Sequence, residues 1–97
     1  MKHRRFDLGR LAVDGLDLPL AYGDVLVVHK DGTGPEWELQ AVFLGDHVFD
    51  PVPVGIEASL LDGRRVTGNA FLVRTRERMA VFRGIGDLDG VAADELH

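Results

Sequence analysis

The sequence predicts an all-β domain, a small antiparallel barrel or sandwich of six or seven strands with no long helix. Runs in which apolar and polar residues alternate recur along the chain, and short turn signals containing Gly, Asp or Pro separate them. No stretch shows a 3.6-residue apolar pattern better than a two-residue one. Many short strands joined by tight turns are typical of both architectures, and the pattern does not choose between them.

Bulk composition indicates one soluble globular domain. The chain has 97 residues, 45% of them hydrophobic, and no cysteine, which excludes disulfides and thiolate metal sites. Its longest apolar runs, such as Val25–Val28, are far shorter than the ~20 residues of a membrane-spanning helix. The basic start, Met1–Arg5, leads into no apolar segment, so no signal peptide is expected. We therefore expect no membrane association and, by default, a cytoplasmic location.

The first strand is expected over His3–Val13, with a bulge at Gly9, where the apolar parity changes. Asp14-Gly15 is a turn signal, and Leu16–Leu18 is a short strand that Pro19 ends. Tyr22-Gly23-Asp24 is interpreted as a second turn.

Val25–Lys30 is β-branched and apolar on both faces, which indicates an interior strand. A polar loop over 31–36 follows, and Trp37–Phe43 alternates strongly enough to form a hairpin with Val25–Lys30. The segment 45–53 contains two prolines and is expected to be irregular.

The best-defined hairpin lies between Val54 and Leu72. A three-residue loop of Leu61, Asp62 and Gly63 places the apolar residues of both strands on one face, whereas a two-residue Asp-Gly loop does not. This register pairs Leu60 with Arg64, Ala58 with Val66 and Ile56 with Gly68, and it requires positive φ at Gly63.

Beyond this hairpin, Phe71–Val73 is apolar on both faces, Thr75–Arg78 forms a turn, and a last strand begins at Met79. Gly84 and Gly86 are expected to end that strand. The predicted division is a single β domain over 1–86 and an acidic, loosely ordered C-terminal tail over 87–97, with a helical turn or two at most over Val91–Leu96.

Charge is segregated along the chain, although the net charge is only −5. Residues 1–10 carry +3, residues 11–62 carry −9, residues 63–83 carry +5 and residues 84–97 carry −4. The favoured interpretation is that acidic and basic faces screen each other within the domain. The alternative is that the basic strand pair meets an anionic partner.

No catalytic or metal-binding motif is visible. Ser59, the only serine, lacks the strand-turn-helix context of an activated nucleophile. His47 lies between Asp46 and Asp50, which could hold a cation, but acidic residues near prolines are more typical of turns. We expect no enzymatic activity, no metal and no cofactor.

Arginines are the main candidates for binding a partner or nucleic acid. They form two groups at opposite ends of the middle strand, roughly 30 Å apart at ~3.3 Å per residue: Arg64 and Arg65 at one, and Arg74, Arg76 and Arg78 at the other. Two patches are not the continuous basic track with stacking aromatics that nucleic acids favour, and Phe71 and Phe82 are interpreted as buried.

Trp37 is a further candidate, because Glu36 and Glu38 flank it as in a carbohydrate or small-ligand site, but a core position is favoured.

The segment Ile56-x-Ala58-x-Leu60-x-Asp62-Gly63-Arg64-x-Val66-x-Gly68 resembles the first motif of Sm-like small barrels. That resemblance implies a turn at Asp62-Gly63 and a second glycine, Gly68, on a bent strand. The Asp and the Met-Asn pair that Sm-like proteins use for RNA and ring contacts are missing from 75–80, and no N-terminal helix is present. We interpret the likeness as shared turn chemistry and assign no family.

The sequence thus predicts a non-enzymatic interaction or structural module, a subunit of a homo-oligomer or a larger assembly, with basic hairpin tips contacting acidic faces head to tail. The alternative is a nucleic-acid-binding small barrel that uses the arginine-rich hairpin ends, and the third possibility is a small-ligand binder that uses Trp37.

Overall fold

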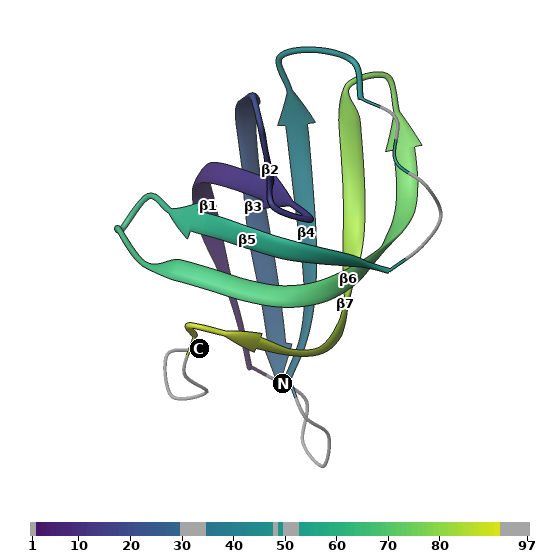
Figure 1. Cartoon of the computed structure of the whole chain (residues 1–97). Helices are drawn as coiled ribbons and strands as arrows, with labels where there is room; N and C mark the ends of the chain where they lie inside the picture. The colour runs from purple at the N-terminus through teal and green to yellow at the C-terminus, as the bar shows by residue number, and fades with distance from the viewer. Residues whose placement is uncertain (1, 30–34, 48, 50–52, 92–97) are drawn as a thin grey trace.

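Every regular element of the chain is a β-strand in the computed structural model, which describes residues 2–29, 35–47, 49 and 53–91. The prediction of an all-β domain of six or seven strands is confirmed (Figure 1). The seven strands are β1 (Lys2–Val13), β2 (Leu16–Leu18), β3 (Leu20–His29), β4 (Pro35–Phe43), β5 (Val54–Leu60), β6 (Arg65–Arg76) and β7 (Met79–Asp89).

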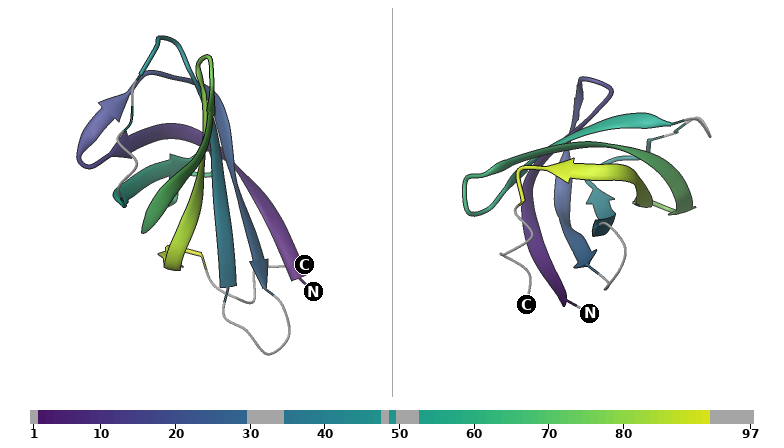
Figure 2. Two further views of the ribbon diagram at one scale, coloured as in Figure 1. Left: turned by 90° about the vertical axis from the view of Figure 1, so that its right-hand side faces the viewer. Right: turned by 90° about the horizontal axis from the view of Figure 1, so that it is seen from below.

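The strands form a closed barrel. Their order is β2-β1-β3-β4-β7-β6-β5, and β5 also pairs with β1, so six antiparallel strands close and β2 is added at the side. Strands β5 and β6 cross in front of β3 and β4 in Figure 1, and Figure 2 shows the two layers from the side and from below. Strand β1 belongs to both layers because residues 2–7 pair with β3 and residues 8–13 pair with β5. Its register with β5 shifts between Leu8 and Arg10, which confirms the bulge predicted at Gly9.

Trp37 fills the interior of the barrel where β6 and β7 bend. Its side chain is 3% exposed, and its indole Nε1 donates a hydrogen bond to the Gly86 carbonyl oxygen at 3.2 Å. A Cβ placed on Gly68 would lie 2.7 Å from the ring, and one placed on Gly84 would lie 2.2 Å from it. The two strands can therefore pass over the indole only because these positions lack side chains. The favoured core position of Trp37 is confirmed.

The β5–β6 hairpin has the predicted three-residue loop. The Leu60 amide donates to the Arg64 carbonyl at 2.7 Å, and the Gly63 amide donates to the Leu60 carbonyl at 3.0 Å. Gly63 has a φ of +94°, the left-handed conformation that glycine adopts without strain. Ala58 lies opposite Val66 and Ile56 opposite Gly68, so the predicted register is correct.

The turn predicted at Tyr22-Gly23-Asp24 is wrong. These residues continue β3, where Tyr22 pairs with Val42 after a register shift that follows Leu20. A Cβ on Gly23 would lie 2.6 Å from the carbonyl oxygen of Gln40. This glycine therefore permits a close approach of two strands, a role that local sequence does not distinguish from a turn.

The last strand is longer than predicted. Gly84 and Gly86 do not end it: β7 bends there, with a φ of +75° at Gly86, and continues to Asp89 with Leu88 buried. Residues 87–89, assigned from the sequence to the tail, thus belong to the barrel. Residues 92–97 and 30–34 lie outside the described residues. The polar loop was predicted over 31–36, but its last two residues, Pro35 and Glu36, belong to β4.

Candidate interaction face

Four neighbouring strands, β3, β4, β7 and β6, carry side chains at the positions that alternate with those facing the barrel interior. These side chains are exposed or half-buried, except Val81, which is 7% exposed. We call this surface the outer face. Strand register arranges it in three rows across the sheet: Tyr22, Val42, Met79 and Arg76; then Asp24, Gln40, Val81 and Arg74; then Leu26, Glu38, Arg83 and Phe71.

The first row borders an open hollow of about 740 Å³ beside the β6–β7 turn. Half-buried Val42 and Met79 form its floor, and the Gln40 Nε2 atom lies 3.4 Å from the Met79 sulfur, to which it donates. Tyr22 stands at one edge with 68% of its surface exposed. An exposed aromatic residue beside a partly apolar floor is a combination common at protein interfaces.

Charged side chains surround this hollow. Its lining includes Asp46, Arg76, Glu77 and Arg78. Arg78 and Asp46 form an ion pair, with Nε and Oδ1 3.6 Å apart. Within the described part of the chain, Arg76 and Glu77 have no ion pair, and neither has Arg74 in the second row. Two opposite charges at the rim, adjacent in the sequence, therefore have no ion-pair partner among the residues that the structure describes.

The opposite end of the face has a second hollow of about 480 Å³ at the β4–β7 border. Leu26, Val28 and Gly84 line it together with Glu38 and Arg83, whose Oε2 and Nη2 atoms lie 3.6 Å apart. Trp37 also contributes to this lining, but its ring is enclosed by β6 and β7. Little of the indole is available for a sugar or another small ligand to stack on.

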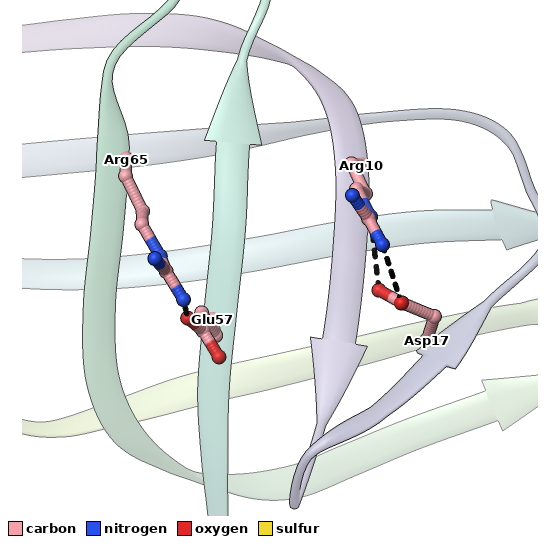
Figure 3. Close-up of polar contacts among 4 residues, drawn as sticks. All are labelled: Arg10, Asp17, Glu57 and Arg65. Carbon is pink, nitrogen blue, oxygen red and sulfur yellow. Dashed lines mark hydrogen bonds and ion pairs between the residues drawn. The ribbon is translucent and has the colours of Figure 1, made fainter.

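Arg64 and Arg65 lie at the other end of β6, and both contact acidic residues of their own domain. Arg64 donates to both oxygens of Asp62, and its guanidinium carbon lies 5.0 Å from the centre of the Phe6 ring. Figure 3 shows Arg65 on β6 paired with Glu57 on β5 and, next to it, Arg10 on β1 paired with Asp17 on β2. The basic residues here are neutralised locally, as the screening interpretation of the charge pattern predicts.

The Asp62–Arg64 contact predicts how acid affects stability. Hydrogen bonding from Arg64 holds the pKa of the Asp62 carboxyl below its ordinary value. A carboxyl whose pKa is lower in the folded state stabilises the fold above its unfolded pKa, about 3.9, and loses that contribution as pH falls through the folded value. We expect Asp62→Asn to be less stable than wild type in urea at pH 7, and the difference to shrink below about pH 4. A difference that stays constant down to pH 2.5 would contradict this assignment.

The two arginine groups are separate, as predicted. Arg74 and Arg76 share the outer face with Arg83, and Arg78 lies in the adjoining turn, whereas Arg64 and Arg65 lie at the opposite end of β6 (Figure 1). Sequence analysis missed two exposed aromatic residues on the face. Tyr22 was assigned to a turn, and Phe71, interpreted as buried, is 45% exposed opposite Arg83. Val66 and Ala70 lie an even number of residues apart and both point inward, so the alternation along the strand places the next residue, Phe71, on the outer side.

The described residues contain no group of three or more His, Asp or Glu side chains that could hold a metal ion. Asp46 contacts Arg78, while the half-buried His47 ring lies edge-on to Phe43, with centroids 5.1 Å apart. Asp50, the third residue of the sequence-based cation hypothesis, lies outside the described residues. The same described part of the chain has no helix with the length and apolarity to cross a membrane.

A scan against protein-family models, a search of curated proteins and a search of solved structures find no match to this chain. The likeness to the first Sm-like motif therefore rests on the residues between Ile56 and Gly68 alone. Gly68 does lie at an irregular point of β6, where the register with β7 shifts between Thr67 and Asn69.

Proposed function

We propose that this chain is a non-enzymatic interaction or structural module that works as a subunit of a homo-oligomer, alone or within a larger assembly. The observation that carries the proposal is the row Tyr22–Val42–Met79–Arg76 across four strands. It joins an exposed aromatic ring, a partly apolar floor and a cation that has no ion pair with any described residue. Such a surface can bury its apolar area against another macromolecule and offer that partner a charge to pair with.

Two of the other exposed apolar side chains do not have this setting. Leu61, 71% exposed, lies on the three-residue loop of the β5–β6 hairpin, and Leu16 lies on the short added strand β2. Isolated exposed leucines are normal on monomeric proteins. Leu61 therefore serves as a matched control for Tyr22.

Sedimentation velocity over a range of concentrations tests the proposal. We expect the wild-type chain to self-associate, and Tyr22→Ser to raise the concentration of half-association at least about tenfold, because truncating an aromatic hot-spot residue of an interface costs about 2 kcal/mol or more. Leu61→Ser should leave that concentration unchanged. A wild-type chain that stays monomeric at millimolar concentration would overturn the proposal, as would equal effects of the two substitutions.

A second candidate function is nucleic-acid binding through Arg64, Arg65, Arg74, Arg76 and Arg78. The exposure of Phe71 supports it, because Phe71 lies opposite Arg83 and one row from Arg74. Sheet faces with exposed aromatic residues and arginines stack single-stranded bases. Acidic Asp24 and Glu38 on the same face and a net charge of −5 weigh against it.

The two candidates separate in one experiment. Fluorescence anisotropy of a labelled single-stranded oligonucleotide is measured with the samples used for sedimentation, at several salt concentrations. Binding that weakens linearly with the logarithm of salt, together with a monomeric chain, would favour nucleic acid. Self-association without anisotropy change supports the first proposal.

A further inference from the structure

We infer that two copies of this chain pair face to face across a two-fold axis, each covering the hollow beside the β6–β7 turn of the other. The inference rests on the proposed self-association and adds its geometry: the same patch on both copies, with Arg76 of one copy contacting Glu77 of the second and Glu77 of the first contacting Arg76 of the second.

Charge is the first argument. Each chain carries a net charge of −5, so two copies repel each other on average. The hollow is an exception, because Arg76 and Arg78 balance Asp46 and Glu77 in its lining. Two such hollows can approach each other with little repulsion.

The distribution of ion pairs then selects the contacts. Arg78 is already paired with Asp46 within one chain, which leaves Arg76 and Glu77 as the unpaired charges of the lining among the described residues. They are adjacent in sequence, Arg76 at the end of β6 and Glu77 in the turn with a φ of +55°. In a two-fold interface, a contact from Arg76 of one copy to Glu77 of the second is repeated by symmetry from Glu77 of the first to Arg76 of the second. Both charges of each copy are then paired.

Shape is the second argument. The hollow of about 740 Å³ is open to solvent, so a side chain of a second copy can enter it. The exposed Tyr22 ring at its edge is a group of suitable chemistry, because tyrosine buries a large apolar body while its hydroxyl keeps a polar contact. Across the axis, Tyr22 of each copy can pack over Val42 and Met79 of the other.

This geometry replaces the head-to-tail contact expected from the sequence. That expectation treated the hairpin tip as purely basic. The tip contains Glu77 itself, and Arg78 is neutralised by Asp46. Glu57 and Asp17, which belong to the acidic segment, are also taken by arginines of their own chain. A patch with both charges matches a second copy of itself better than it matches the remaining acidic surface.

Charge reversal in two separate chains tests the inference. Arg76→Glu alone places like negative charges opposite each other, and Glu77→Arg alone places like positive charges opposite each other, so each variant should associate at least about tenfold more weakly than wild type. An equimolar mixture of the two variants satisfies both contacts and should form a dimer of wild-type affinity that contains one chain of each. Sedimentation and native mass spectrometry measure the affinity and composition.

Asp87→Arg is the control, because it changes the net charge by the same amount as Glu77→Arg at an exposed site on the far part of β7. It should leave association intact, and circular dichroism should show all variants folded. Wild-type association that Glu77→Arg leaves unchanged or strengthens, or a mixture that fails to recover, would overturn the two-fold geometry while leaving self-association standing. A monomeric wild type would instead overturn the proposed function.

Discussion

Gly84→Ala is expected to lower the free energy of unfolding by about 3 kcal/mol, the upper range for overpacking a core. The new Cβ would lie 2.2 Å from both Cε2 and Nε1 of Trp37. The indole ring cannot move aside freely, because β6 packs closely against it at Gly68. The ring is also held by the hydrogen bond from Trp37 Nε1 to the Gly86 carbonyl oxygen. Urea denaturation followed by circular dichroism measures the change.

Gly45→Ala is the matched control for this substitution. Gly45 has no positive φ, and a Cβ there would meet nothing within 4 Å, so stability should change by less than about 0.5 kcal/mol. A second test uses Trp37→Leu, which removes the atoms that the new Cβ would meet. In that background Gly84→Ala should cost much less than in wild type, since contacting residues are not additive. Equal costs in both backgrounds would show that the clash with Trp37 is not the cause.

Parts of the fold that depend on neighbouring residues could be predicted from the sequence. The loop of Leu61, Asp62 and Gly63 followed from the parity of the two flanking strands, because only a three-residue loop places Ala58 and Val66 on one face. The bulge at Gly9 followed in the same way from a change of parity. Both features are determined within about ten residues of chain.

Features that depend on distant residues could not be predicted. Gly84 bends β7 because Trp37 lies beneath it, and these residues are far apart in the sequence. Without knowledge of that contact, Gly84 and Gly86 were taken as the end of a strand that in fact continues to Asp89. Gly23 was taken as a turn for the same reason, although it permits the close approach of β3 to β4 at Gln40.

The candidate site shows the same division. Separation of the arginines into two groups followed from strand length alone, and the structure confirms that they lie at opposite ends of β6. Which arginines are neutralised did not follow, because the acidic partners come from other strands: Glu57 from β5 for Arg65, and Glu38 from β4 for Arg83. Arg76 was a candidate from the sequence together with Arg74 and Arg78, but only these ion pairs distinguish it from its neutralised neighbours and add Glu77 to it.

Phe82→Ala is expected to destabilise the domain by about 3–5 kcal/mol, and Phe71→Ala by less than about 1 kcal/mol. The two phenylalanines lie on adjacent strands, and both are interpreted as buried from the sequence. Phe82 is 0% exposed and contacts Phe49, with ring centroids 5.5 Å apart, so its loss leaves a cavity in the barrel. Phe71 points to solvent from the outer face. Urea denaturation of the two variants under the same conditions measures both costs.

The size of the difference between these variants also bears on function. If Phe71→Ala keeps the wild-type stability, any change it causes in association or in oligonucleotide binding belongs to the outer face and not to unfolding. Phe71 lies two rows from the hollow, so the proposed two-fold contact predicts a smaller effect on association from Phe71→Ala than from Tyr22→Ser.

Base stacking on the sheet would require both rings and would make the two effects on oligonucleotide binding comparable. Equal stability costs of Phe71→Ala and Phe82→Ala would show that Phe71 is buried in solution. Phe71 would then not belong to the outer face.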